Sequence, residues 1–526
     1  MKKITLLSDN HDIIIKFIND IKEEREFFVS SIFLPDDNNS LSNYYDNIKT
    51  IKYSDLEILN NKIFKNFKYF CESDFNKYYN CKKTFFKMLD FHTHDQNLYT
   101  SSEKDKLFIK TLNFILNFLK EESPDIIINL HIPHNYFEVL LAEVCEINKI
   151  KHIFVRHFGI PSVYTLQVEL YSNSLINEYF SNDKVFNSNY SITHDAIINS
   201  SKELKKNVKL TKKNDKWQNN SLIFLDTNNK FNILFFLIIR VYILFKENFK
   251  VFIKIILNIF KKNFFFSFQK SYYFLERLKV QDKELHEHKI SNFYFNYISF
   301  KSDIKKLHLI KKYKNFSKKP NLDDKFIFFP LWYQPSASTY PFAEKFMDNI
   351  NVIKLLIKNN RGLKIYVKEH EDNFNLSRHA WVKGSYSKNI KFYEEMSKMK
   401  GLSFINFEIS DSELMDKSFA IATQPSKNSL ISTFRKKPVL MFGHSLLNGL
   451  DGIFNINDQK DLNTALSKIG LDFKIDTIKQ NKFFNILSQF SFLTDKMNSF
   501  NKDETKTDYK DMLSILKKII YLERQN

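Results

Sequence analysis

Four segments of the chain determine the predicted fold: KFIFFPLWYQPSASTYP (325–341), LKIYVKEHEDNF (363–374), FAIATQPSKNSL (419–430) and KKPVLMFGHS (436–445). Each begins with an apolar run rich in β-forming residues and ends at polar or turn-forming residues. Parallel strands buried on both faces have such runs, and ligands bind outside their carboxyl ends. The segments therefore predict neighbouring parallel strands whose polar ends line one edge of a sheet.

Residues 321–490 are predicted to form one α/β domain around these segments. Strands alternate with helical patterns, as in a doubly wound sheet. The last strand, Pro438–Phe442, is expected to close the sheet. The strands are expected near Phe326, Leu363, Phe404, Phe419 and Val439.

Residues 1–200 are predicted to form a Rossmann-like domain of their own. Ile4–Leu7 and Phe27–Leu34 flank a helical repeat, and a second strand, helix, strand unit spans Ile126–Val155. Residues 40–120 have helical periodicity. Seven of the 8 glycines lie from Gly362 onward, which excludes a glycine-rich phosphate loop from this half. Two such domains facing a cleft make an α/β, GT-B-like architecture.

Length and composition agree with two domains and an anionic partner. At 526 residues the chain exceeds the size of one hydrophobic core. Its formal net charge of +19 favours nucleotides, acidic glycans or phospholipid surfaces, or it reflects only a general preference for lysine. Three cysteines without a CxxC motif indicate a reducing compartment, and the short apolar run after Met1 is no signal peptide. We therefore expect a cytoplasmic protein.

Residues 201–320 are predicted to be a linker followed by a helical, strongly apolar and basic insertion. The run Ile233–Phe245 is interrupted by Arg240 and is too short to span a bilayer. Two alternatives stay open: a basic amphipathic helix on the inner face of an anionic membrane, or a helical hairpin packed between the domains. Residues 491–526 are predicted to form a C-terminal helical tail, with a helix over Tyr509–Leu522.

The strand ends supply the candidate site residues. Lys368, Glu369 and His370 suit phosphate binding and proton transfer, so Glu369 and His370 are the candidate catalytic residues. A helix that begins after Gln424 would direct free N–H groups at an anion. The candidate donor-binding residues are Gln334, Ser336, Ser338, Lys368, Gln424, Ser426 and Gly443.

The first domain supplies the candidates for the acceptor side. The strand that ends at Leu130 is followed by HIPH, and the next strand ends at Arg156-His157. Alternatively, Pro133 only starts a helix and the histidines cap it. His92 and His94 lack a third ligand nearby, so no metal site is predicted. The acceptor-side candidates are His134, Glu138, Arg156 and His157.

The order FPLWYQPSAST, YVKEHE, FYEE, DSELM, FAIAT and KKPVLMFG resembles the capsule polysaccharide synthesis glycosyltransferase family, which includes the β-Kdo transferases. The resemblance covers about Asp323 to Ala465 well and the first domain only in patches. It implies a metal-independent GT-B enzyme without cofactors that uses a nucleotide-activated sugar, such as CMP-Kdo or a related ulosonic acid. It places Gln334 and Ser338 in the donor loop, Lys368 to His370 near phosphate and sugar, and Gln424 with Ser426 at the nucleotide.

Two departures from the family pattern matter. Glu371 stands where the family has proline, and PSKNSLIS (425–432) replaces a loop with glycines and a glutamate. The predicted function is a glycosyltransferase of capsular or lipid-linked surface polysaccharide synthesis, with a polysaccharide or lipid-linked acceptor. The alternative is a catalytically inactive scaffold in a polysaccharide assembly complex. Nucleic-acid binding is disfavoured, because the basic residues form no recognised module.

Overall fold

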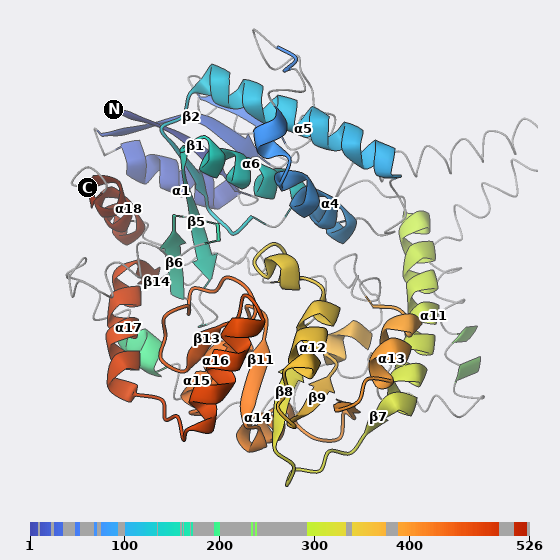
Figure 1. Ribbon diagram of the computed structural model, residues 1–526. Coiled ribbons are helices and arrows are strands. Elements are labelled where there is room, and N and C mark those ends of the chain that lie inside the picture. The colour runs from blue at the N-terminus through green and yellow to red at the C-terminus, as the bar shows by residue number, and fades with distance from the viewer. Residues whose placement is uncertain are drawn as a thin grey trace, which may run out of the picture.

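The computed structural model describes two α/β domains, each built on a mainly parallel sheet of seven strands among the described residues (Figure 1). This confirms the predicted fold class. The described residues are 1–8, 11–22, 26–34, 48–52, 68–70, 75–92, 100–133, 135–157, 160, 163–168, 170–171, 194–199, 233–234, 237–238, 292–332, 339–374, 388–493 and 510–522.

The sheet of the first domain is parallel in its centre and antiparallel at one edge. Its strands pair in the order β14 (Ser491–Leu493), β6 (Val163–Gln167), β5 (Lys151–His157), β4 (Ile126–Asn129), β1 (Lys2–Leu7), β2 (Phe27–Leu34) and β3 (Lys49–Lys52). The helices of this domain are α1 (His11–Lys22), α4 (Cys81–His92), α5 (Ser101–Glu122) and α6 (Tyr136–Ile147), with a 3-10 turn at Asn76–Tyr78.

The sheet of the second domain is parallel throughout its described pairs. Its strands pair in the order β13 (Ile453–Asn455), β12 (Val439–Met441), β11 (Ala420–Thr423), β8 (Phe326–Pro330), β9 (Lys364–Lys368), β10 (Leu402–Ile405) and β7 (Ser317–Lys318). Its helices are α11 (Asn292–Phe316), α12 (Asn349–Lys358), α13 (Ile390–Ser397), α14 (Asp411–Lys417), α15 (Lys427–Phe434) and α16 (Gln459–Gly470). Short 3-10 turns lie at Glu344–Phe346 and Glu371–Phe374.

Several short strands were not predicted. β3 lies in a stretch predicted as helical, β6 runs antiparallel to β5, and β13 lies outside β12, so Pro438–Phe442 does not close the second sheet. Strands of two to five residues carry too little periodicity to be recognised alone. They can be recognised as strands only from the neighbouring strands with which they pair.

The C-terminal part of the chain returns to the first domain. After α17 (Thr477–Gln489), β14 pairs antiparallel with β6, and α18 (Lys510–Leu522) packs near α1, so both chain ends lie on one side of that domain (Figure 1). Residues that the sequence assigned to a separate tail are therefore part of the first domain's core. Likewise, α11 packs on α13 of the second domain. Of residues 201–320, predicted as a linker and a helical insertion, the structure describes 233–234 and 237–238, which are helical, and 292–320, which contain α11 and β7.

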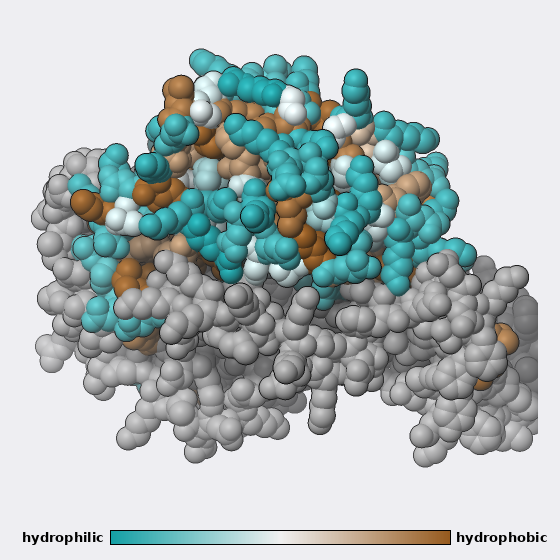
Figure 2. Space-filling view, turned by 90° about the horizontal axis from the view of Figure 1, so that it is seen from below, coloured by the Kyte–Doolittle hydropathy of each residue, from teal (hydrophilic) through white to brown (hydrophobic). Residues whose placement is uncertain are grey.

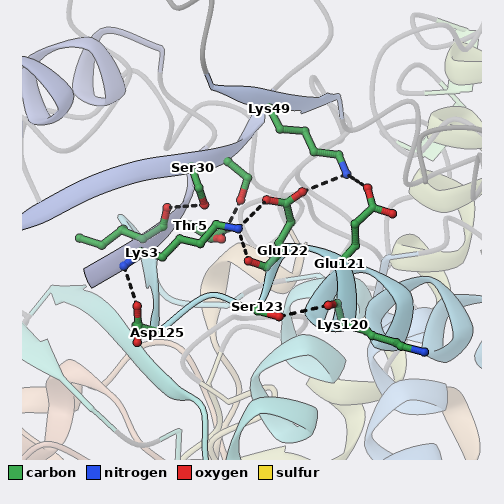
Figure 3. A network of polar contacts seen from close by, with 11 residues as sticks. Lys3, Thr5, Ser30, Lys49, Lys120, Glu121, Glu122, Ser123 and Asp125 are labelled. Carbon is green, nitrogen blue, oxygen red and sulfur yellow. Dashed lines mark hydrogen bonds and ion pairs between the residues drawn. The ribbon is translucent and has the colours of Figure 1, made fainter. Parts of the chain in front are cut away.

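A network of ion pairs ties the amino end of the first sheet to the end of α5 (Figure 3). The Lys3 N–H donates to Asp125 over 2.7 Å, and Lys49 Nζ lies 2.8 Å from Glu121 and 3.0 Å from Glu122. Burial alone would lower the pKa of Lys49, but the two carboxylates outweigh it and raise this pKa. These acidic groups are neutralised at the edge of the sheet opposite the strand ends that line the candidate site.

The two domains share an apolar core. Leu430 and Phe434 of α15, with Leu446, Leu447 and Leu450, belong to the same buried cluster as side chains of β1, α1, α17 and α18. Seen from below, the described surface is mostly hydrophilic, and its apolar residues are interspersed among polar ones (Figure 2). None of the helices in the described residues is long and apolar enough to cross a membrane.

Candidate functional site

The ends of β8 and β9 place two rings side by side. These strands pair in parallel with Pro330 opposite Lys368, so the residues that follow leave the sheet together. The rings of Trp332 and His370 pack edge to face with centroids 5.4 Å apart. His370 is half-buried, and its N–H donates to Glu369 Oε1 over 2.9 Å. Three donor-loop candidates, Gln334, Ser336 and Ser338, lie outside the described residues.

Glu369 is enclosed by donors and does not face solvent. Its side chain is 0% exposed and is contacted by Lys388 Nζ at 2.7 Å, Tyr393 OH at 2.8 Å and Asn373 Nδ2 at 2.7 Å. Burial, together with the charge of Glu369, raises the pKa of Tyr393, so this hydroxyl stays a donor. A carboxylate held in this way orders the loop after β9. The geometry does not suit the proton transfer that the sequence assigned to Glu369.

Lys368 is also bound to protein groups. Its Nζ donates to the carbonyl oxygen of Ile409 over 2.8 Å and to Asp411 Oδ1 over 2.6 Å. The Lys368 side chain is 5% exposed, whereas Asp411 is 46% exposed. The pair fastens the start of α14 to β9, so the charge predicted for a donor phosphate is already neutralised.

The end of β11 leads into α15 through Gln424, Pro425 and Ser426. The Gln424 Nε2 donates to the carbonyl oxygen of Phe346, and its buried Oε1 has no partner among the described residues. Ser426 is the N-cap of α15, and its hydroxyl lies 2.9 Å from Thr423 Oγ1 instead of capping the helix. The first N–H groups of α15 are therefore not occupied by a capping side chain.

Gly443 permits a close approach between two loops. Its φ is +122°, and a Cβ there would lie 2.6 Å from Ala343 Cα and from the Phe342 carbonyl oxygen. The next N–H, of His444, donates to that same oxygen over 2.8 Å. Gly443 thus fixes the loop that presents Phe342 to the first domain, which is a structural role that the sequence did not predict.

Arg156, near the end of β5, is a buried cation without a carboxylate partner among the described residues. It is 8% exposed, donates to Gln167 Oε1 over 3.0 Å, and lies 4.2 Å from the ring centroid of Phe342. Burial lowers the pKa of Arg156 to about 10, so it remains protonated at neutral pH. Buried charges are normally paired, and an unpaired one costs several kcal/mol.

His157 lies on the opposite face of β5, toward α15. Its ring packs 5.2 Å from that of Tyr164. Burial lowers the pKa of His157, and the positive charge of Lys427 lowers it further. Lys427, the first residue of α15, is therefore close enough across the domain boundary to act on His157. We name Arg156, His157, Phe342, Ser426 and Lys427 the interdomain site.

The structure brings Glu138 together with a residue that the sequence analysis did not select. Glu138 is 0% exposed, and its Oε1 lies 3.0 Å from Nε2 of His131, just beyond β4. His134, the predicted candidate in this turn, lies outside the described residues. The spacing of seven residues between a strand end and the first turn of a helix was the available signal for the pair. No group of three or more potential metal ligands occurs in the part of the chain that the structure describes.

The candidates thus divide into two sets. Arg156 lies against Phe342, whose loop Gly443 supports, and His157 lies close enough to Lys427 to feel its charge, both across the domain boundary. Lys368 and Glu369 are bound within the second domain instead.

Comparisons with known proteins find likenesses of fold. No family model and no curated protein sequence matches the chain. A solved β-Kdo 2,7-transferase, KpsC of Thermosulfurimonas dismutans, is 14% identical over 44% of this chain and 66% of that one, with a TM-score of 0.22. The UDP-GlcNAc 2-epimerase of Methanocaldococcus jannaschii in complex with UDP-GlcNAc and UDP is 12% identical over 91% and 97%, with a TM-score of 0.25. The sucrose-phosphate synthase of Thermosynechococcus elongatus is 8% identical over 100% and 99%, with a TM-score of 0.26. At these identities and TM-scores, the likenesses assign neither a substrate nor a reaction to this chain.

Proposed function

We propose that this protein is a glycosyltransferase that uses a nucleotide-activated sugar, with the anionic leaving group held in the interdomain site. The observation that carries the proposal is Arg156, a buried cation with no carboxylate partner among the described residues. A phosphate bound there would supply the missing counter-charge. Lys427, from the second domain, adds a positive charge at the domain boundary, close enough to lower the pKa of His157.

The residues of the site take separate roles in this proposal. The first N–H groups of α15 and the Ser426 hydroxyl bind the phosphate, since a helix N-terminus favours an anion. Lys427 and Arg156 neutralise the charge that develops as the sugar leaves, in place of a metal ion. His370, held against Trp332, lies at the neighbouring strand end for contacts with the sugar.

The finer proposal concerns the substrates. The blocks YVKEHE and KKPVLMFG support a CMP-activated acidic sugar such as Kdo or a related ulosonic acid, used in capsular or lipid-linked surface polysaccharide synthesis. The net charge of +19 suits an anionic donor, an acidic glycan acceptor and an anionic membrane surface. A cytoplasmic enzyme at the inner face of the membrane would meet all three.

A second candidate is a non-catalytic scaffold in a polysaccharide assembly complex. It is favoured by the neutralisation of Lys368 by Asp411 and of Glu369 by Lys388. The two candidates differ in one prediction. As a scaffold, the His370→Ala variant would sustain surface glycan production, and as an enzyme it would not.

The test is to incubate the purified chain with CMP- and UDP-sugars and to measure nucleotide binding by calorimetry and nucleotide release by chromatography. Binding with release that depends on a glycan acceptor supports the transferase. Binding without release with any acceptor supports the scaffold. If no nucleotide or nucleotide sugar binds, the proposal is wrong. The Arg435→Gln variant, which alters the ion pair between Arg435, just after α15, and Asp416 of α14, is the control for Arg156→Gln.

A further inference from the structure

Two large apolar side chains stand in solvent at the ends of the loop between α16 and α17. Leu471, just after α16, is 84% exposed, and Ile478, in the first turn of α17, is 79% exposed. Apart from Met1, no large apolar side chain among the described residues is as exposed as these two. A single exposed leucine is ordinary on a protein surface, but two at the ends of one loop mark a place where apolar groups gather.

The loop between them is fixed against the edge of the second sheet. The ring of Phe473 packs edge to face on that of Phe454 in β13, with centroids 5.2 Å apart. The Asp476 N–H donates to Asp451 Oδ2 over 2.6 Å. Phe473 and Phe454 are both partly exposed, so they extend the apolar surface from Leu471 onto the edge strand.

Lysines are interleaved with these apolar side chains. Lys474 and Lys479 are exposed, one inside the loop and one in the first turn of α17. Lys468, also exposed, places its Nζ 5.7 Å from the ring centroid of Phe454 and 5.6 Å from that of Phe473. The apolar surface is therefore bordered by ammonium groups.

The acidic residues of the same stretch offset these charges only in part. Asp476 is the N-cap of α17, and its Oδ1 accepts the N–H groups of Ile478 and Lys479 over 2.9 Å and 3.3 Å. Its carboxylate is thus engaged by the backbone, and Asp472 is the remaining acidic residue between 468 and 479. Three lysines against two aspartates leave this surface positively charged.

The combination of exposed apolar groups and lysines fits a lipid surface better than a protein partner. The cores of protein interfaces are depleted of lysine, because its charge is costly to bury there. At a bilayer surface, a lysine stem lies among apolar groups while its ammonium reaches a phosphate, and anionic lipids attract it further. Charge complementarity therefore selects an anionic phospholipid membrane.

We propose that residues 468–479 are a membrane-docking loop. Leu471 and Ile478 insert into the boundary between headgroups and acyl chains of an anionic bilayer, and the three lysines bind lipid phosphates. This inference rests on the membrane partner of the proposed function, which the sequence analysis assigned to residues 201–320 and not to this loop. Its test requires no nucleotide, so its outcome is independent of the transferase reaction.

The experiment measures sedimentation of the full chain with vesicles of equal parts phosphatidylglycerol and phosphatidylcholine, and with phosphatidylcholine alone. The wild type should bind the anionic vesicles at least about 10-fold more tightly than the neutral ones. Leu471→Ser/Ile478→Ser should weaken this binding about 100-fold, since each inserted side chain contributes about tenfold. Lys474→Gln/Lys479→Gln should weaken it about 30-fold, or about fivefold for each lysine, and this difference should shrink in 0.5 M salt.

Two double variants elsewhere are the matched controls. Ile109→Ser/Ile147→Ser removes two exposed isoleucines of the first domain, and Lys354→Gln/Lys358→Gln removes two exposed charges of α12. Both should bind anionic vesicles within about threefold of the wild type. All four variants should unfold in urea as the wild type does, because the altered side chains are exposed. Hydrogen exchange of the docking loop should slow when anionic vesicles are added to the wild type.

Three results would overturn the inference. The first is a wild type that does not bind anionic vesicles, and nucleotide binding and release would then still decide the proposed transferase. The second is binding by the loop variants as tight as that of the wild type, which would place the membrane contact elsewhere. The third is a change in the self-association of the loop variants, measured by ultracentrifugation without vesicles, with vesicle binding unchanged. The loop would then be a contact between copies of this chain.

Discussion

Two buried charges in this molecule differ in whether a neighbouring group of opposite charge compensates them. Glu369 at the end of β9 is surrounded by Lys388, Tyr393 and Asn373, all within 2.9 Å. Arg156 near the end of β5 is almost as deeply buried, yet its contacts among the described residues are an amide oxygen and an aromatic ring. The first charge is compensated within its own domain. The second lies against Phe342 of the other domain, and in the proposed function a bound anion compensates it.

The comparison corrects the ranking of candidates that adjacency in the sequence suggests. A reactive cluster is suggested by three consecutive residues at a strand end, Lys368, Glu369 and His370. However, Lys368 and Glu369 each form an ion pair with another residue of the second domain. Arg156 and Lys427 are 271 positions apart and lie on different domains. Compensation by neighbours, and not proximity in sequence, therefore decides which charges remain available to a ligand.

The largest effect is expected from breaking the compensated charge. Lys388→Met should lower the free energy of unfolding by about 3–5 kcal/mol, because it leaves Glu369 ionised and buried without a cation. Urea unfolding measures this loss. The double variant Lys388→Met/Glu369→Leu should recover part of it. A single variant as stable as the wild type would contradict the assignment of Glu369 to the fold.

The buried carboxylate of Glu143, whose partners are neutral, should have a smaller effect on the free energy of unfolding, and this effect should depend on pH. Burial raises the pKa of Glu143 to about 7 from 4.5, although hydrogen bonds from Tyr171, Cys81 and Thr84 oppose this. The folded state therefore holds this proton more tightly than the unfolded state. The contribution of Glu143 to stability is fully present below pH 4.5 and is lost as the pH rises toward 7, by about 2–3 kcal/mol. Unfolding measured at pH 5 and pH 8 should show a weaker pH dependence in Glu143→Gln.

Removing the charge of Arg156 should weaken the binding of an anion and leave the stability of the fold almost unchanged. Arg156→Gln should weaken the binding of pyrophosphate or CMP by about 10- to 100-fold, since a hydrogen bond to a charged group contributes about 1.5–3 kcal/mol. The free energy of unfolding should stay within about 1 kcal/mol of the wild type, because a buried, unpaired cation is removed. Calorimetric titration and urea unfolding give the two values. Unchanged anion affinity in this variant would remove the observation on which the proposed function rests.

The smallest effect is expected from a surface pair. Arg435 Nη1 lies 2.6 Å from Asp416 Oδ1 and Oδ2, and the aspartate is 52% exposed while the arginine is 12% exposed. Exposed ion pairs contribute about 0.2–1 kcal/mol, so Asp416→Asn should lower the free energy of unfolding by no more than that. The effect should fade further in 1 M salt. If Asp416→Asn lowered the free energy of unfolding as much as Lys388→Met, burial would not explain the difference between the two ion pairs.

Much of the second domain could be predicted from its residues. The runs FIFFP, KIYVK and AIAT are buried strands at the expected places, because parallel strands covered on both faces need continuous apolar residues. Helix caps are equally local, as at Ser410, whose hydroxyl accepts the Glu413 N–H at the start of α14. The insertion after residue 200, by contrast, lies mostly outside the described residues and stays a prediction.

The candidate site was only partly predictable. Arg156 and His157 were selected because they end a strand, but the sequence could not show that one lies against Phe342 and the other near Lys427. Glu138 was selected without its partner, because His131 precedes α6 in a turn whose direction the sequence does not specify. The role of Gly443 required the position of the Phe342 loop.

The sequence by itself determined the alternation of strands and helices, the two-domain plan and the strand ends at which polar residues gather, because periodicity and turn residues act over a few positions of the chain. Only the tertiary structure decided which charges are neutralised, which edge strands complete the sheets, and that the C-terminal segment returns to the first domain. The physical reason is that pairing and burial depend on groups distant in sequence, whose approach is fixed only when the two sheets pack.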